Sequence, residues 1–396
     1  MPLLSRPADA PPERLENYLA VGGYEALRGA KEAAPEAVVA VVTAAGLRGR
    51  GGAGFPAARK WELARAADGQ PKYVVANGGE HEPGSRKDRF LVTNYPHRVL
   101  EGALLCAYAT GATEVYLYLI EDMTEAIASA RKAIDEASAG GLLDGVEVHV
   151  TLAPTTYVAG EETAALEVIE GRKAWPRKKP PYPGQKGLWG KPTTVNNVET
   201  LAFVPAIVRG ESGEPTMLVT LDEGVARPGI YEVAVGTTFR SVIDDLGGGS
   251  RGGRPVKAIL PAMSSAFLEA SALDVPMTHE AVREAGSNLG CAGVSIIEEG
   301  TCVVERTLEI AEFFMREQCG QCPPCRMETN TIAAVLRKVK AGEAGDYRAQ
   351  IEKITTFTRG KGKCSLIEMA AAPALSALSL FPEDFAHHAE HGSCPG

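Results

Sequence analysis

The spacing of apolar residues predicts alternating strands and helices in the first half of the chain. A short apolar run predicts a buried strand over residues 72–77, and two further strands are predicted over residues 113–120 and 146–152. Helical spacing over residues 97–110 and 124–139 separates these runs. The resulting order, β-α-β-α-β, predicts a parallel α/β sheet with helices covering its faces.

The remaining segments predict a helical start, a second module and a helical end. Residues 11–45 have helical spacing, and residues 216–300 hold short strand-like runs at 217–221 and 229–235. Helices are predicted near the end of the chain over residues 307–317, 330–341, 346–357 and 366–380, the last with a kink at Pro373. We therefore expect a small α/β module followed by a helical bundle.

Composition and charge narrow the class of protein. The 396 residues exceed what one hydrophobic core usually supports, so two or three domains are expected. A formal net charge of -9 disfavours proteins that bind nucleic acids or anionic membranes. The start lacks a signal-peptide pattern and no run reaches about 18 apolar residues, so we expect a cytoplasmic protein without direct membrane insertion.

Three of the eight cysteines lie within seven residues, as Cys319, Cys322 and Cys325. The two-residue spacers let three thiolates converge on one inorganic centre, and Cys364 is the next candidate for the fourth ligand that such a centre needs. This pattern predicts one iron–sulfur cluster. A structural zinc site is the alternative, although such sites usually use pairs of cysteines.

The other cysteines lie far from this group in the sequence. Cys106, Cys291 and Cys302 have apolar neighbours, so we expect them to act as small buried hydrophobic residues. Cys394 lies near the end of the sequence, where we expect a frayed tail and a free thiol.

Residues 49–54, GRGGAG, form a glycine-rich loop of the formal pattern G-x-G-x-x-G. Missing side chains let backbone N–H groups approach a phosphate closely. The preceding segment has helical spacing, whereas a dinucleotide fingerprint follows a strand, so an ordinary Rossmann motif is excluded. A plain turn is the alternative interpretation of this loop.

Polar side chains follow two of the predicted strands. Asn77 begins the segment NGGEHEPG at the end of the first strand, where its amide could hydrogen-bond a flavin. After the third strand, the segment YVAGEE from Tyr157 to Glu162 again combines a glycine with paired acids. A solvated start of a helix is the alternative interpretation of that second segment.

A basic segment is the one local candidate for an anion site. Residues 172–191 hold seven Lys or Arg residues and no Asp or Glu. Trp175 and Tyr182 offer flat faces on which an adenine or nicotinamide ring could stack. A solvated charged surface is the alternative.

Five segments occur in order along the chain, namely GLRGRGGAGFPAARKW (46–61), ANGGEHEPGSRKDR (76–89), YVAGEETA (157–164), KKPPYPGQKGLWGKPTTVNNVET (178–200) and CGQCPPC (319–325) with Cys364. Together they resemble the NADH-binding flavoprotein subunit of respiratory complex I. Relatives of that subunit serve as diaphorase subunits of NAD-linked hydrogenases and formate dehydrogenases.

The resemblance implies a four-part α/β organisation: an N-terminal helical segment (1–45), a modified Rossmann-like FMN and NADH domain (46–215), a ubiquitin-like SLBB module (216–300) and a helical domain (301–396) that binds one [4Fe-4S] cluster. It implies FMN contacts from Gly49, Gly51, Lys60, Asn77, Tyr157, Gly160, Glu161, Asn196 and Asn197. NADH contacts are implied for Phe55, Glu82, Glu162, Lys179 and Tyr182, and the cluster ligands for Cys319, Cys322, Cys325 and Cys364.

Three positions depart from the pattern of that family. Gly79 stands where the family usually has Asp, His81 replaces a glycine between two glutamates, and Leu63 lies near the usual aromatic partner of adenine. The change at Gly79 removes a flavin hydrogen bond, and the His81 imidazole would intrude where backbone lies close to the cofactor. These departures bear on flavin affinity and nicotinamide specificity rather than on the fold.

The resemblance also implies a function. The chain would oxidise NADH by hydride transfer to FMN, without a protein acid or base, and pass single electrons to the [4Fe-4S] cluster. The expected partners are a thioredoxin-like [2Fe-2S] subunit and a multi-cluster iron–sulfur subunit, which would hold the chain peripherally at the cytoplasmic face of a membrane. The alternatives are a diaphorase that reduces NAD in a formate- or hydrogen-linked complex, and a relay subunit without nicotinamide turnover.

Overall fold

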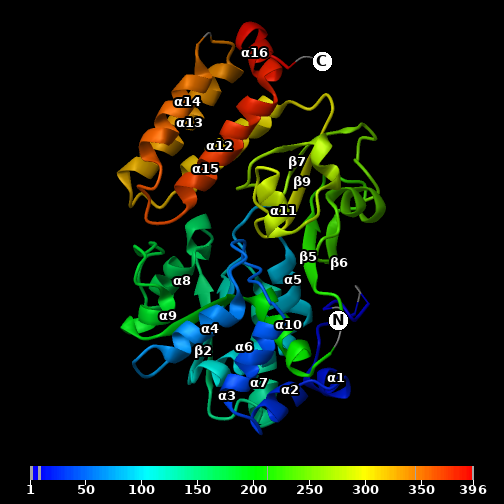
Figure 1. The fold of residues 1–396 in the computed structure, drawn as a ribbon, viewed down its shortest axis with the longest axis vertical. Helices are drawn as coiled ribbons and strands as arrows, with labels where there is room; N and C mark the ends of the chain where they lie inside the picture. Colours follow the sequence, from blue (N-terminus) through cyan, green and yellow to red (C-terminus); the bar gives the residue numbers. More distant parts are fainter. Residues whose placement is uncertain (1–2, 8–9, 212, 344, 395–396) are drawn as a thin grey trace. The chain divides into compact units, whose positions relative to one another are not determined.

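The computed structural model describes residues 3–7, 10–211, 213–343 and 345–394. The chain divides into two compact units (Figure 1). One unit comprises Met1–His81 and Arg86–Met217, and the other comprises Glu82–Ser85 and Leu218–Gly396.

The first unit is built on a four-stranded parallel sheet with the order β3-β2-β1-β4. Its strands are β1 (Tyr73–Gly78), β2 (Glu114–Ile120), β3 (Glu147–Ala153) and β4 (Thr193–Asn197). The three predicted strands are confirmed, and β4 is an addition that the apolar pattern did not indicate. Since β2 and β3 lie on one side of β1 and β4 on the other, the strand order reverses between β1 and β4. Such a reversal is where open α/β sheets bind ligands.

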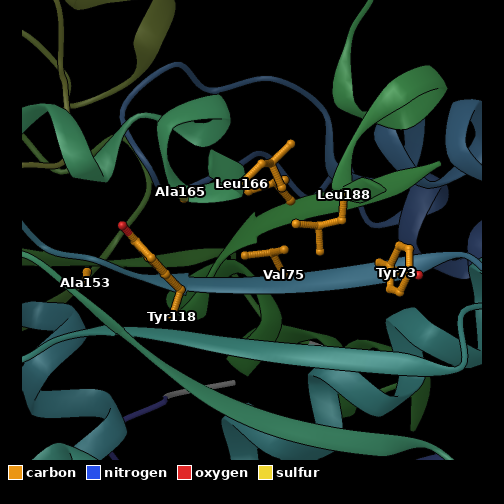
Figure 2. Close-up of a cluster of buried hydrophobic side chains, with 8 residues drawn as sticks. Tyr73, Val75, Tyr118, Ala153, Ala165, Leu166 and Leu188 are labelled. Atoms are coloured by element: carbon orange, nitrogen blue, oxygen red, sulfur yellow. The ribbon is translucent and has the colours of Figure 1, made fainter. Parts of the chain in front are cut away.

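One face of this sheet is covered by α8 (Glu162–Ile169) and the short turn η2 (Leu188–Gly190). Figure 2 shows Val75 lying against Leu166 and Leu188, with the Tyr118 side chain extending from the same side of the sheet. The complete cluster consists of Tyr73, Val75, Tyr118, Ala153, Ala165, Leu166, Leu188 and Val195. Alternate residues of β1 and β4 point to this face of the sheet. The burial of the cluster between this face and the covering segments stabilises the sheet.

Helix α6 (Pro96–Thr110) packs against the strands and against several other helices. It was predicted as a buried helix, and 13 of its 15 residues are buried. The other helices of this unit are α1 (Leu15–Ala20), α2 (Glu25–Ala30), α3 (Pro35–Ala44), α4 (Ala57–Ala66), α5 (Lys87–Asn94), α7 (Thr124–Ala139), α9 (Pro183–Lys186) and α10 (Val198–Val208). The helical start predicted over residues 11–45 is therefore three short helices.

The second unit contains a mixed five-stranded sheet with the order β6-β5-β9-β7-β8. Its strands are β5 (Thr216–Leu221), β6 (Gly229–Ala234), β7 (Val256–Leu260), β8 (Leu268–Glu269) and β9 (Gly293–Glu298). β5 pairs with β9 in parallel, whereas β7 pairs with β8 and β9 antiparallel. The module also has η3 (Ser241–Leu246), η4 (Ala270–Asp274) and α11 (His279–Glu284). The strands predicted at 217–221 and 229–235 are confirmed.

Five helices form the end of the second unit: α12 (Val303–Glu317), α13 (Pro323–Lys340), α14 (Tyr347–Thr358), α15 (Leu366–Leu380) and α16 (Pro382–His391). The first four were predicted, and α16 was not. No single described helix is long and apolar enough to cross a membrane. Taken together, α15 and α16 have the length and apolar composition of a membrane span, but the two helices are bent by 87° relative to each other. α15 packs its apolar side against α12, α13 and α14.

Helices α6 and α10 approach closely at Gly102, where a Cβ atom would lie 1.9 Å from the carbonyl oxygen of Leu201. We predict that Gly102→Ala lowers the free energy of unfolding by about 1–3 kcal/mol, because the backbone of α10 cannot yield as a side chain would. Gly29→Ala in α2 is the matched control, since its Cβ would meet nothing within 4 Å. That substitution should raise stability by up to about 1 kcal/mol. Urea unfolding of both variants tests this, and equal effects would contradict the close approach.

Candidate functional site

Two asparagines meet where the strand order of the first unit reverses. Asn77 ends β1 next to Asn197 of β4, and the two residues are in register. The Asn197 side-chain amide donates to the Asn77 carbonyl at 3.3 Å, and the Asn77 side-chain amide donates to the carbonyl of Gly160 at 3.1 Å. The carboxyl ends of β1 and β4 therefore share one polar surface with the turn η1 (Tyr157–Gly160).

The glycine-rich loop lies over this surface. The Gly49 N–H donates to the Phe55 carbonyl at 2.9 Å, and Arg48 forms a β-bridge with Pro56, so the loop folds back on itself. A Cβ atom at Gly51 would lie 3.4 Å from the Cβ of Asn197, which places the loop backbone directly against β4. The preceding segment is helix α3, which confirms that an ordinary Rossmann motif is absent here.

A buried carboxylate anchors the loop. Glu199, 1% exposed in the first turn of α10, lies 3.9 Å from Arg50 Nε and 2.9 Å from Lys87 Nζ. The Arg50 N–H also donates to the Thr200 hydroxyl at 2.9 Å. Burial lowers the pKa of Arg50, and the charge of Glu199 opposes that shift. Glu199 thus joins the glycine-rich loop to α5 and α10.

Lys87 extends this polar cluster to the asparagines. Its Nζ lies 2.6 Å from one oxygen of Asp88 and 3.2 Å from the side-chain oxygen of Asn197. The side-chain N–H of Asn197 donates to the other oxygen of Asp88 at 2.6 Å. Burial raises the pKa of Asp88 to about 7, with Lys87 acting in the opposite direction. The carboxylates of Asp88 and Glu199 outweigh burial and keep the pKa of Lys87 above its usual value.

Lys87, Asp88 and Glu199 were missed as functional candidates. They lie in the segments that carry the family resemblance. What distinguishes these three charged residues from others is that their side chains are buried, and burial cannot be recognised from the sequence alone. Lys87 is 1% exposed, which is rare for an unpaired lysine and marks a position held by opposite charges.

A second charged group lies at the start of α8. Lys179 Nζ lies 2.9 Å from Glu161 and 3.0 Å from Glu162, while Lys60 Nζ lies 3.1 Å from Glu162 and 3.2 Å from the carbonyl of Val195 on β4. Burial would raise the pKa of Glu162, but the two lysines outweigh it and hold that pKa below the usual value. Glu161 caps α8, because its carboxylate accepts hydrogen bonds from the backbone N–H groups of Thr163 and Ala164 at 2.8 and 2.9 Å.

The two asparagines of β4 point in opposite directions. The Asn196 side chain is 4% exposed and its amide faces Cys106 on α6, 3.8 Å from the sulfur. Successive strand residues alternate between faces, so Asn197 shares the face of Val195 and Asn77 while Asn196 does not. The structure therefore brings Asn197 to the polar surface and turns the Asn196 side chain away from it.

The residues expected to contact NADH differ in their exposure and in their partners. Phe55 and Tyr182 are exposed, at 43% and 55%, and Lys179 and Glu162 form the ion pair described above. Glu82 belongs to the second unit, where one of its oxygens accepts the N–H and the hydroxyl of Ser264 at 2.9 and 2.7 Å.

The departures Gly79 and His81 lie beside the polar surface. The Gly79 N–H donates to the side-chain oxygen of Asn77 at 3.0 Å, and a Cβ at Gly79 would lie 3.0 Å from that oxygen and 3.1 Å from Tyr118. The His81 ring packs against Gly160, where a Cβ would be 3.0 Å from a ring carbon. Its Nε2 is buried without a hydrogen-bond partner among the described residues. Burial lowers the pKa of His81 to about 4.

The basic segment carries fewer unpaired charges than its sequence indicates. Arg172 and Arg177 both pair with Glu167 and Glu170 on one side of α8. A hollow of about 360 Å³ lies among these four residues, and Lys178, Pro181, Lys186, Gly187, Trp189 and Gly190 complete its lining. The anion site expected here therefore contains two carboxylates.

The four candidate cluster cysteines lie in the helical part of the second unit. Cys319 follows α12, Cys322 and Cys325 lie at the start of α13, and Cys364 precedes α15. Burial raises the pKa of Cys325 to about 12, and the thiols of Cys364, Cys322 and Cys319 add to this effect in that order. The four thiols are therefore neighbours, although Cys364 is 39 residues from Cys325 in the sequence.

Their spacing fits a cluster better than a zinc ion. In tetrahedral zinc sites the sulfur atoms lie roughly 3.8 Å apart, as Zn–S bonds of about 2.3 Å require. Among the described residues, no three of these four sulfur atoms lie within 4.8 Å of one another. A four-thiol donor set of this wider spacing suits an iron–sulfur cluster.

The other cysteines differ from expectation in part. Cys106 is fully buried on α6, as predicted, whereas Cys291 is only partly buried. The expectation for Cys302 is wrong, because the residue is only partly buried and its sulfur faces His388 Nε2 at 3.1 Å. Cys394 is a free thiol, as predicted, but it hydrogen-bonds to Cys302. These polar contacts join positions about 90 residues apart, which the local sequence around each cysteine does not reveal.

Two protein families match this chain. The Nuo51 FMN-binding domain matches residues 42–206, and the iron-sulfur binding region of NADH-ubiquinone oxidoreductase-F matches residues 305–388. The first match covers the glycine-rich loop and both asparagines, and the second covers the four clustered cysteines. The expected FMN and [4Fe-4S] cofactors are thereby confirmed.

Curated relatives match along the whole chain. The F 2 subunit of NADH-quinone oxidoreductase of Rhizobium meliloti is 40% identical, with 100% of this chain and 99% of the relative covered. The F subunit of NADH-quinone oxidoreductase of Escherichia coli is 38% identical over 95% of this chain and 90% of the relative. Among solved structures, an NAD+-reducing [NiFe]-hydrogenase in the air-oxidized state has a TM-score of 0.85 at 30% identity, with 100% of this chain and 68% of that chain covered.

The buried, neutral His81 predicts a pH dependence of stability. Because its pKa falls from 6.5 in the unfolded chain to about 4 on folding, the unfolded state binds more protons between these values. Stability is therefore full above about pH 6.5 and decreases as the pH falls toward 4. Between about pH 7 and pH 5, the cofactor-free chain should lose about 2 kcal/mol more than its His81→Gln variant.

Urea unfolding at several pH values measures this difference. His149→Gln is the control, because the His149 ring is 40% exposed, and it should follow the unsubstituted chain. Parallel pH profiles for the chain and His81→Gln would show that the imidazole is hydrated rather than buried.

Proposed function

The chain belongs to the family of NADH-quinone oxidoreductase F subunits, and on that premise we propose that it is an electron-input subunit that oxidises NADH. It would transfer hydride from NADH to FMN and pass electrons to a [4Fe-4S] cluster bound by Cys319, Cys322, Cys325 and Cys364. FMN supplies the conversion between a two-electron hydride donor and one-electron acceptors.

The observation that carries the proposal is the meeting of Gly51, Asn77, Gly160 and Asn197 where the strand order reverses. The residues present fit a flavin mononucleotide. Glycines at 51 and 160 leave backbone accessible to a phosphate or a ring. The Asn77 amide keeps one N–H and one oxygen lone pair for ring atoms, whereas the hydrogen-bonding groups of the Asn197 amide are all used within the protein, so Asn197 would contact the flavin by packing. The FMN contacts of Gly49, Lys60, Tyr157 and Glu161 belong to this proposal, while for Asn196 only its backbone remains available at the site.

In the proposed mechanism the protein positions the reactants and performs no proton transfer. Asn197, fixed by Lys87 and Asp88, would orient the flavin, because its amide has no freedom to rotate without breaking buried hydrogen bonds. Lys60 and Lys179 bring positive charge to the same region, held in place by Glu162. Since Glu161 and Glu162 balance the two lysine charges, the lysines would act on a bound nucleotide as fixed hydrogen-bond donors.

The nicotinamide nucleotide would approach from the exposed side of the first unit. Phe55 and Tyr182 present aromatic faces to solvent, where a ring could stack. Leu63, 41% exposed on α4, offers only apolar contact near the position of the aromatic residue that the family uses for adenine. Weaker adenine binding than in relatives follows from this replacement.

The family names imply partners. The relatives named above are F subunits of NADH-quinone oxidoreductases, so we propose that this chain passes electrons to further redox subunits, namely a thioredoxin-like [2Fe-2S] subunit and a multi-cluster iron–sulfur subunit. These partners would place it peripherally at the cytoplasmic face of a membrane. The division at residues 45, 215 and 300 into a helical start, an FMN domain, an SLBB module and a cluster domain is part of the same proposal.

A second candidate runs the same chemistry in reverse. The match to an NAD+-reducing [NiFe]-hydrogenase favours a diaphorase subunit that reduces NAD with electrons from hydrogen or formate. Both candidates use the same cofactors, and co-purified subunits distinguish them.

The proposal is tested by anaerobic absorption spectroscopy of the chain reconstituted with FMN and iron. NADH should bleach the blue absorption band of the flavin and then reduce the cluster. Cys364→Ser removes one cluster ligand but no residue of the first unit. It should therefore retain flavin bleaching and lose the paramagnetic signal of the reduced cluster.

The opposite pattern would contradict the proposal. If the cluster forms, FMN binds and neither NADH nor NADPH bleaches the flavin, the chain is a relay subunit without nicotinamide turnover. The segment from Gly79 to His81 would then be the first place to restore the family pattern.

A further inference from the structure

A second group of metal-ligating side chains lies in the second unit, apart from the four clustered cysteines. The Cys302 sulfur, a ring nitrogen of His388 and the Cys394 sulfur all lie within 4.8 Å of one another. The Cys302 sulfur and the His388 Nε2 are separated by 3.1 Å. None of these residues contributes to the site described above.

Cys302 occupies the N-cap position of α12, a helix of 15 residues. Its sulfur accepts the N–H of Glu305 at 3.3 Å, so the thiol faces the first turn of the helix. The sulfur, which would bind a metal as the thiolate, is thereby fixed in position at the start of α12.

His388 supplies a nitrogen ligand from α16. The residue is only 3% exposed, and its Nε2 is directed at the Cys302 sulfur rather than at solvent. Its Nδ1 is buried and has no hydrogen-bond partner among the described residues. The ring nitrogens of a histidine buried to this degree need hydrogen-bond or metal partners. The sulfur atom of Cys302 provides one for Nε2.

We propose that Cys302, His388 and Cys394 bind one zinc ion. Two cysteines and a histidine form the mixed sulfur and nitrogen donor set that zinc prefers, and two thiolates neutralise its charge. Tetrahedral zinc places such ligand atoms roughly 3.5–3.8 Å apart, which the present separations allow after small side-chain movements. The fourth position is left to water.

The zinc ion would have a structural effect. It would join the segment that follows α16 to the start of α12, where the chain passes from β9 into the helical bundle. One turn before His388, Asp384 already pairs with Lys257 of β7 at 2.6 Å. The metal and this ion pair would together attach α16 to both parts of the second unit.

Zinc binding is tested on the full chain with its [4Fe-4S] cluster reconstituted, so that the cluster cysteines are occupied. After treatment with a chelator, zinc is added and bound zinc is measured by mass spectrometry of the metal and by competition with a chromophoric chelator. We expect one zinc ion per chain. Cys302→Ser and His388→Ala should each weaken zinc binding at least about 100-fold, while the iron content stays unchanged.

His387→Ala is the matched control, because His387 is the neighbouring histidine on α16 and its Nδ1 faces the carbonyl of Ser393 instead. This variant should bind zinc as the unsubstituted chain does. Cobalt added in place of zinc gives a second measurement, since thiolate ligation produces near-ultraviolet absorption that Cys394→Ser should reduce.

Three outcomes would overturn the proposal. The first is no zinc bound by the unsubstituted chain. The second is zinc retained at full affinity in the Cys302→Ser and Cys394→Ser double variant. The third is a disulfide between these two cysteines in protein purified under reducing conditions, because a disulfide leaves no thiolate for the metal.

Discussion

The buried ion pair between Glu199 and Lys87 is the interaction on which the cofactor site depends. Glu199 lies in the first turn of α10, Lys87 begins α5, and both side chains are almost completely inaccessible to water. Removing Glu199 would leave Lys87 with Asp88 as its charged partner, and removing Lys87 would leave Glu199 with Arg50 at 3.9 Å, so either change weakens a buried network of charges. Because Arg50 pairs with Glu199 and the Asn197 side chain accepts a hydrogen bond from Lys87, the ion pair connects the glycine-rich loop to β4.

This arrangement explains how a parallel sheet without an ordinary Rossmann motif can bind a nucleotide. In the ordinary motif a glycine-rich turn follows the first strand directly. Here the loop precedes α4 and reaches the end of β4 from a different part of the chain, so charged side chains must perform the positioning. The strand reversal between β1 and β4 supplies the space, and Gly51 allows the loop to lie against Asn197.

Much of the fold could be predicted from the apolar pattern, because β1 and β2 are largely buried and most helices have one buried face. β4 was missed because its five residues, TTVNN, are mostly polar, and parallel pairing rather than composition makes it a strand. The proposed cofactor site was predicted from five ordered segments that resemble one family. Its support by Lys87 and Glu199, and the meeting of Cys302 with Cys394, depend on contacts between distant residues that no local pattern encodes.

A structure of the FMN-loaded chain tests the central claim most directly, namely that the flavin binds where the strand order reverses and that the Lys87 and Glu199 pair holds that place. The account predicts flavin density at the carboxyl ends of β1 and β4, in contact with Gly51 and with the side chains of Asn77 and Asn197, while the ion pair remains intact. Flavin density away from both strand ends, or an Asn197 side chain released from Lys87 and Asp88 on binding, would contradict it.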